Sequence, residues 1–148
     1  MLTIDVHHDI QAPLERVWPY LEDFDDIQAW WPTDPVGIER VELEGEGVGQ
    51  IRHIYSVGSP NPISERLDFL DSGSHTWKLS IVGRRPAGLL EYQATGRLTA
   101  RGPDACRMTY HAEFMAREGR VETAKAFLLG LYQSMFRGLE AAAKRKRT

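Results

Sequence analysis

Hydrophobic and polar residues alternate over the first ten positions of the chain. Within residues 3–10, one side carries Ile4, Val6, His8 and Ile10, and the other carries Asp5, His7 and Asp9. A period of two residues indicates a strand that is buried on one face. Ala12-Pro13 ends this pattern, and Pro suits the first turn of a helix because the N–H group that it lacks would be unpaired there.

Two short helices are predicted after this strand. From Leu14 the spacing becomes helical, with an apolar stripe formed by Leu14, Val17, Trp18 and Leu21. Asp23 has the residue type of a helix N-cap, and the apolar residues Phe24, Ile27 and Trp31 follow it at intervals of three and four. Pro32 and Pro35 then end the second helix.

The middle of the chain returns to the strand pattern and repeats it. Strands are expected over residues 36–43, 50–57, 63–70, 75–81, 90–98 and 106–114, and short turns rich in Gly, Pro, Asn and Asp separate many of them. Regular strands joined by short turns favour an antiparallel meander over parallel crossovers.

A long helix is predicted after Gly119. Its apolar stripe consists of Val121, Ala124, Leu128, Leu131, Tyr132, Met135, Leu139 and Ala142. This stripe corresponds to about six to seven helical turns, which is long enough to cross a whole sheet. Because neither a repeat nor a linker interrupts this order, we expect one α+β domain over residues 1–148.

Composition and charge narrow the class of protein. Of the 148 residues, 42% are hydrophobic and 26% are charged, which is typical of a globular protein and not of a disordered one. The net charge of -3 gives no reason to expect nucleic acid, and the basic segment 144–147 is interpreted as a solvated helix end. We expect no membrane span and no signal peptide, and the single Cys106 cannot form an internal disulfide. A cytoplasmic location is therefore expected.

Several segments of the chain, in a fixed order, carry a resemblance to a known family. They are residues 12–18, Asp23-Phe24 with Trp30, residues 47–52, residues 63–67, residues 106–110 continuing to Phe114, and the final helix. In these segments the chain resembles the START-like (SRPBCC) superfamily, and in particular its polyketide cyclase/dehydrase group. The superfamily includes aromatase/cyclases and carriers of lipids and hormones, so the resemblance constrains fold more than function.

The resemblance implies the helix-grip fold. In this fold a strongly curved, seven-stranded antiparallel sheet holds the long C-terminal helix, and two short helices close one end. It also implies a pocket between the concave face of the sheet and the long helix. This order of elements agrees with the one that the hydrophobic periodicity predicts.

Strand parity and helix spacing give the side chains that we expect to face this pocket. The candidate ligand-binding residues are Tyr55, Leu67, Phe69, Trp77, Tyr92, Met108, Tyr110 and Phe114 in strands, Leu128, Tyr132, Met135 and Phe136 in the final helix, and Trp30 or Trp31 at the mouth. An apolar wall with a few polar tips suits a flat, partly polar organic ligand. The competing interpretation for the aromatic residues, above all Phe69, Trp77 and Phe114, is a plain core role.

Glu65 is the strongest candidate for a catalytic side chain. It shares its parity with Ile63 and Leu67, which places a carboxylate on the inner face, where it must be paired, hydrated or neutralised. His53 is assigned to the same face, and a His–Glu pair could move protons during an aldol-type cyclisation or dehydration. The alternative for Glu65 is a structural ion pair with an inner-face basic group.

The basic residues are assigned to the other face of the sheet. By parity Arg52, Arg66 and Arg107 point outward, and Arg52 turns inward only if its strand carries a bulge. The carboxylate then has no inner-face arginine beside it, which weakens the enzyme hypothesis. No metal motif or cofactor fingerprint is found, so neither a metal nor a cofactor is expected, and Cys106 is expected to be a buried, inert thiol.

The leading functional prediction is noncovalent binding of a hydrophobic or aromatic small molecule in an internal cavity. A first alternative is a cofactor-free enzyme of the polyketide cyclase, aromatase or dehydrase type that uses the same pocket. A second alternative is a protein-interaction module whose cavity has collapsed. The sequence leaves open which ligand is bound and whether the protein forms a homodimer.

Overall fold

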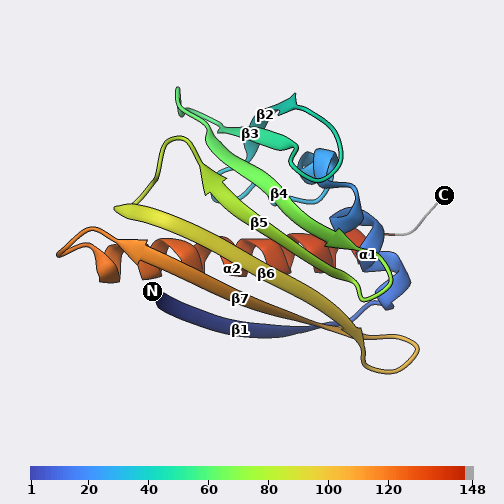
Figure 1. The fold of residues 1–148 in the computed structure, drawn as a ribbon. Helices are drawn as coiled ribbons and strands as arrows, with labels where there is room; N and C mark the ends of the chain where they lie inside the picture. The colour runs from blue at the N-terminus through green and yellow to red at the C-terminus, as the bar shows by residue number, and fades with distance from the viewer. Residues whose placement is uncertain (146–148) are drawn as a thin grey trace.

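A computed structural model describes residues 1–145, which form seven strands and three helices (Figure 1). In chain order they are β1 (Leu2–Ile10), α1 (Leu14–Glu22), η1 (Phe24–Ala29), β2 (Ile38–Glu44), β3 (Ile51–Ser56), β4 (Ile63–Asp71), β5 (Thr76–Val82), β6 (Leu89–Ala100), β7 (Cys106–Ala116) and α2 (Val121–Lys144). The end of the basic segment, residues 146–147, lies outside the described residues.

The predicted elements are all present, and the ends of the strands lie within two residues of their expected positions. The second short helix differs in kind, because η1 is a 3-10 helix that ends at Ala29 and leaves Trp31 beyond it. Asp23 stands at its N-cap position, but its side chain makes no capping hydrogen bond. None of the helices within residues 1–145 is long and apolar enough to cross a membrane.

All seven strands form one antiparallel sheet in the order β1-β7-β6-β5-β4-β3-β2. Strands β2 to β7 are thus neighbours in the order of the chain, while β1 pairs with β7 and lies at one edge. Figure 1 shows the sheet curving around α2, which crosses one of its faces, with α1 and η1 at one end of that face. This arrangement is the helix-grip fold.

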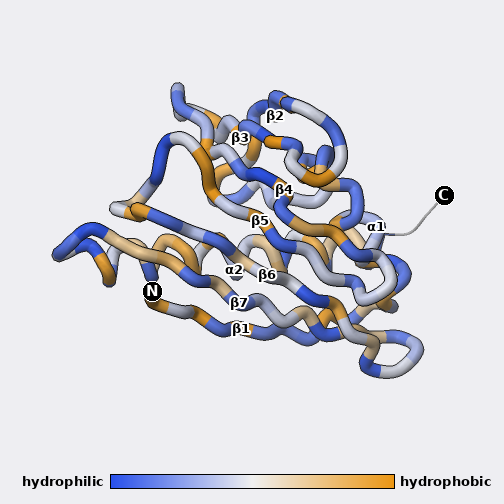
Figure 2. Tube along the Cα trace, viewed as in Figure 1, coloured by the Kyte–Doolittle hydropathy of each residue, from blue (hydrophilic) through white to orange (hydrophobic). Residues whose placement is uncertain are grey.

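The hydrophobic core lies between the sheet and α2. Fully buried side chains come from both layers, among them Leu98 and Phe114 in the sheet and Leu128 and Leu139 in α2. Figure 2 shows hydrophilic residues gathered at many turns and along the strands that face the viewer, whereas α2 carries hydrophobic residues where it is visible behind them. Burial of this apolar stripe, more than helix propensity, holds a helix of this kind on its sheet.

The register between β3 and β4 corrects the predicted facing of β3. Arg52 pairs directly with Glu65, and residues paired across antiparallel strands point to the same face. Arg52 is therefore on the inner face, where it is 7% exposed, and the assignment of Arg52 to the outer face was wrong. His53 consequently points to the opposite face, so the predicted pairing of His53 with Glu65 was also wrong.

A bulge in β4 corrects the predicted facing of Phe69. The register with β5 shifts between Leu67 and Phe69, so that Leu67 pairs with Leu79 whereas Phe69 pairs with Lys78. The extra residue turns Phe69 away from the core and leaves it 42% exposed. Strict alternation through residue 69 therefore does not hold, although it holds for Glu65 and Leu67.

Candidate functional site

A cavity of about 430 Å³ lies between the sheet and α2, with residues of α1, η1 and the segment after η1 in its wall. This volume falls within the range of about 300–1,000 Å³ that is ordinary for small-molecule pockets. Its lining is mostly apolar and aromatic, and Arg52 and Glu65 are the only charged side chains that line it within residues 1–145. The cavity is open in this structure, which contradicts the premise of a collapsed pocket.

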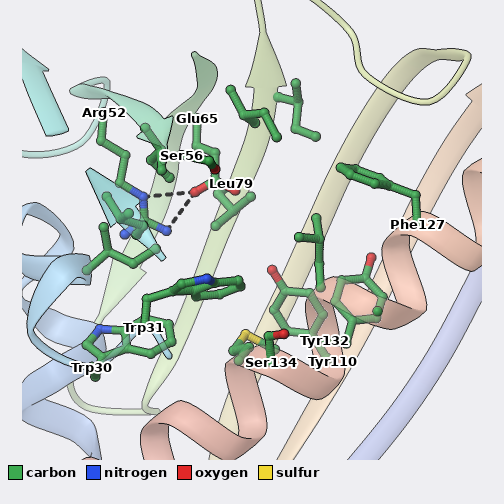
Figure 3. Close-up of a pocket in the computed structure, with 18 of the residues that line it drawn as sticks. Trp30, Trp31, Arg52, Ser56, Glu65, Leu79, Tyr110, Phe127, Tyr132 and Ser134 are labelled. Atoms are coloured by element: carbon green, nitrogen blue, oxygen red, sulfur yellow. Dashed lines mark hydrogen bonds and ion pairs between the residues drawn. The ribbon is translucent and has the colours of Figure 1, made fainter. Parts of the chain in front are cut away.

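Arg52 and Glu65 form an ion pair on one wall of the cavity (Figure 3). The Nη2 and Nε atoms of Arg52 donate to the same oxygen, Oε1 of Glu65, at 2.7 and 2.9 Å. The two side chains are only 8% and 16% exposed. A buried pair of this kind satisfies both charges, as the structural alternative for Glu65 had proposed.

Phe24 of η1 completes the surroundings of Arg52. Its carbonyl oxygen accepts a hydrogen bond of 2.9 Å from Nη1 of Arg52, and the centroid of its ring lies 3.9 Å from the guanidinium carbon. The guanidinium thus donates hydrogen bonds to Glu65 and to the Phe24 carbonyl, and the Phe24 ring covers one of its faces. Oε2 of Glu65, in contrast, makes no hydrogen bond with any side chain or main-chain group of the described residues. The pair therefore has no net charge and lines the cavity with one carboxylate oxygen that has no hydrogen-bond partner among the described residues.

Three tyrosines from three elements line the cavity, and Figure 3 shows two of them, Tyr110 and Tyr132, away from the ion pair. The hydroxyls of Tyr92 in β6 and Tyr132 in α2 are 2.6 Å apart, and the ring of Tyr110 in β7 lies 4.8 Å from that of Tyr132. Burial raises the pKa of all three side chains, so they remain neutral hydroxyls at physiological pH. In this pair one hydroxyl donates a hydrogen bond and the other accepts it. The accepting hydroxyl still has its own proton, which it can donate to another acceptor.

Tryptophans supply the largest flat surfaces of the cavity. Trp30 and Trp31 follow η1, with ring centroids 5.7 Å apart, and Figure 3 shows Trp31 extending into the space beside the ion pair. Trp77 of β5 lies against Gly96 of the neighbouring strand, where a Cβ atom would be 2.2 Å from the indole. Glycine at that position therefore allows the indole to lie flat on the sheet floor.

Half of the predicted site residues line the cavity. They are Glu65, Trp30, Trp31, Trp77, Tyr92, Tyr110, Tyr132 and Met135. Their positions agree with the predicted facing, while their roles in binding or catalysis stay predictions.

The other predicted site residues lie elsewhere. Four of them are buried in the core and do not reach the cavity, namely Leu67, Met108, Phe114 and Leu128. Phe136 stacks on His8 at a centroid distance of 5.1 Å, and Phe69 is turned outward by the bulge. Tyr55 lies under the guanidinium of Arg40, and His53 bonds Ser64 and Glu44. These are corrections to the predicted lining.

The sequence analysis also missed residues that do line the cavity. Arg52 is the most important, and it could have been found only from the pairing of β3 with β4. Phe127 of α2 is another, although the spacing of Phe127, Leu131 and Ser134 indicates a second helix stripe that faces the pocket. Within residues 1–145, no cluster of three or more His, Cys, Asp or Glu side chains is arranged to hold a metal ion.

A curved sheet that grips a long helix over a lined cavity defines a protein of the START-like (SRPBCC) class. More specifically, the chain belongs to the family described as "Polyketide cyclase / dehydrase and lipid transport", whose sequence model matches residues 1–144.

Solved structures share this fold at low sequence identity. A putative uncharacterized protein from Bacillus thuringiensis superposes with a TM-score of 0.82 at 19% identity, covering 97% of this chain and 100% of that one. The Zhui aromatase/cyclase from Streptomyces sp. R1128 gives 0.80 at 18% identity, covering 97% and 94%. Truncated norcoclaurine synthase from Thalictrum flavum gives 0.76 at 19% identity, covering 99% and 96%. At these identities the similarity establishes the fold alone.

Proposed function

We propose that the protein binds a hydrophobic or aromatic small molecule noncovalently in the cavity between the sheet and α2. The observation that carries this proposal is the cavity itself, about 430 Å³ of space lined by tryptophans, tyrosines and aliphatic side chains. Burying the apolar surface of a ligand there contributes binding free energy in proportion to the area removed from water. A family description that includes lipid transport supports the same function.

Two polar groups would orient the ligand inside this apolar wall. Glu65 Oε2 is an acceptor on one side, and the Tyr92–Tyr132 pair holds a spare donor on the other. A few well-placed polar groups in an apolar pocket fix the orientation of a ligand more than they add affinity. The Trp31 and Trp77 rings would then stack on the flat part of the molecule.

A thermal-shift screen against flat aromatics, fatty acids, sterols and phenols tests this proposal. A ligand present at a hundred times its Kd adds about 2.7 kcal/mol of stability, which raises the Tm by about 5–10 °C for a chain of this size. If no class shifts the Tm and calorimetry detects no binding, the proposal fails.

A matched pair of variants on α2 controls for binding elsewhere on the surface. Ser134→Leu fills the cavity from the helix, because Ser134 lines it, whereas Gln133→Leu adds the same side chain at an exposed neighbouring position. We expect the hit to lose at least tenfold in affinity with Ser134→Leu and to be unchanged with Gln133→Leu. Equal affinity for both variants would place the ligand outside the cavity.

The placement of Glu65 and the tyrosines also favours a second candidate, a cofactor-free cyclase or dehydratase. Glu65 could take a proton from a CH₂ group between two carbonyls, and the carbanion would attack a third carbonyl of the same chain. Tyr92 or Tyr132 would protonate the resulting alkoxide and then regain a proton from the protonated Glu65, which restores both side chains and gives an aldol product ready to lose water. The shared fold of the Streptomyces aromatase/cyclase supports this candidate.

A poly-β-ketone analogue tests the cyclase candidate. The wild type would convert it to a cyclic product, and Glu65→Gln would lower the rate by a factor of 100 or more, since general base catalysis contributes about 10²–10⁴-fold. Full activity in Glu65→Gln would exclude this role for Glu65.

A further inference from the structure

We infer that the cavity selects neutral aromatic ligands that carry a hydroxyl group and rejects carboxylates. This inference rests on the proposed binding function and specifies the charge and the hydrogen-bonding group of the ligand. It follows from the way in which Arg52, the one cationic side chain that lines the cavity among the described residues, is already paired.

The positive charge of Arg52 is already compensated by Glu65. Its Nε and Nη2 atoms donate to Glu65 and its Nη1 atom donates to the carbonyl of Phe24, which uses three of its five N–H groups, and the Phe24 ring covers one face of the guanidinium. No other cationic side chain of residues 1–145 lines the cavity. A ligand carboxylate would therefore lose its hydration without meeting an uncompensated positive charge, which disfavours its binding.

The tyrosine wall cannot replace that missing cation. The hydroxyls of Tyr92, Tyr110 and Tyr132 are neutral, so they can donate hydrogen bonds but carry no positive charge. Beyond the larger effect of burial, the charge of Glu65 contributes to raising the pKa of Tyr92, Tyr110 and Tyr132. The negative charge of Glu65 thus acts on this wall, and at Tyr110 the charge of Arg52 only partly offsets it, so the wall provides no positive field for a second anion.

A hydroxyl group on the ligand, in contrast to a carboxylate, can form a favourable hydrogen bond with Glu65. Glu65 lines the cavity, its Oε1 atom carries both bonds from Arg52, and its Oε2 atom has no hydrogen-bond partner among the described residues and is not among their buried unpaired atoms. A phenol O–H that donates to Oε2 forms a charge-assisted hydrogen bond, which is about twice as strong as a neutral one. The aromatic ring of the same ligand would lie among the tryptophans.

Three naphthalene derivatives of nearly the same shape test this inference by calorimetry at neutral pH. They are 2-naphthol, which is a neutral donor, 2-methoxynaphthalene, which lacks the donor, and 2-naphthoate, which is an anion. We expect 2-naphthol to bind about tenfold more tightly than 2-methoxynaphthalene, because it alone donates to a carboxylate. We expect 2-naphthoate to bind more weakly than either.

The variant Glu65→Gln should reverse the preference for charge. It keeps the size of the side chain but leaves the Arg52 cation uncompensated, so 2-naphthoate should gain about tenfold in affinity and 2-naphthol should lose most of its advantage. The affinity of 2-methoxynaphthalene, which makes no use of the charge, should stay unchanged. A gain for all three compounds alike would contradict the assignment of selectivity to Glu65.

The wild-type measurements decide the matter even if Glu65→Gln does not fold. Equal affinity for 2-naphthol and 2-methoxynaphthalene, or binding of 2-naphthoate as tight as that of 2-naphthol, would overturn the inference while leaving the binding function intact. If the folded protein binds none of the three compounds, the proposed binding function for aromatic ligands fails, and the inference fails with it.

Discussion

The main-chain carbonyl oxygen of Trp30 lies directly against Gly138 of α2, where a Cβ atom would come within 2.2 Å of it. The ring of Pro32 lies nearly as close, at 2.8 Å from the same Cβ position. The segment after η1 is therefore pressed onto the helix backbone, and this contact holds Trp30 and Trp31 at their places in the cavity wall.

Gly138→Ala should destabilise the fold by about 1–3 kcal/mol, because the obstructing atom belongs to the main chain and cannot swing away. Gly130 of the same helix is the matched control, since a Cβ there meets nothing within 4 Å. Gly130→Ala should stabilise the protein by up to about 1 kcal/mol through helix propensity alone. Urea unfolding of both variants checks this, and equal effects would contradict the close contact.

The Arg52–Glu65 pair should behave as one unit in a double-mutant cycle. Arg52→Met or Glu65→Gln alone leaves one buried charge without its partner, and each should cost about 3 kcal/mol of unfolding free energy. The double variant should cost less than the sum of the two by about 1 kcal/mol or more. Additive losses in chemical denaturation would mean that the two residues do not stabilise each other.

The cavity tyrosines should resist ionisation in the folded protein. Burial raises the pKa of Tyr92 and Tyr110 well above 10.0, and that of Tyr132 as well. Since the folded-state pKa exceeds the unfolded one, the stability from these groups is complete below pH 10 and decreases as the pH rises above it. The ultraviolet absorbance of tyrosinate should therefore show fewer than five ionised tyrosines at about pH 11 until denaturant is added.

Tyr92→Phe provides the control for this titration. It should remove one tyrosinate from the absorbance of the unfolded protein and leave that of the folded protein at the same pH unchanged. A decrease in the folded protein would show that Tyr92 ionises there.

Cys106 should be unreactive as long as the protein is folded. The side chain is fully buried, and burial raises the pKa of its thiol to about 11, so the nucleophilic thiolate is scarce at mildly alkaline pH. Iodoacetamide should leave the mass of the native protein unchanged and add one group after unfolding, because the chain has one cysteine. Rapid labelling of native protein would contradict this burial.

The elements of the fold could be predicted from periodicity because most of them bury one clear face. In β7 the residues Met108, Tyr110 and Phe114 are buried on one side and polar residues alternate with them. Alternation also places Glu65 on the inner face, because the residues two positions before and after it, Ile63 and Leu67, are apolar.

The facing of β3 could not be predicted in this way, because its two faces are equally polar. One carries Ile51, His53 and Tyr55, and the other carries Arg52, Ile54 and Ser56, so each offers one aliphatic residue and two residues with polar groups. Only pairing with β4 decides between them, and that information lies in another segment of the chain. The bulge before Phe69 is likewise a local departure that alternation alone does not reveal.

Three of the four tryptophans of the chain line the cavity, and the fourth, Trp18, lies 6.2 Å from Trp77 between ring centroids. Nearly all of the protein's intrinsic fluorescence therefore originates at or next to the cavity wall. An occupant would displace water from these indoles or quench them, so the emission spectrum of the unlabelled protein reports directly on whether the cavity is filled.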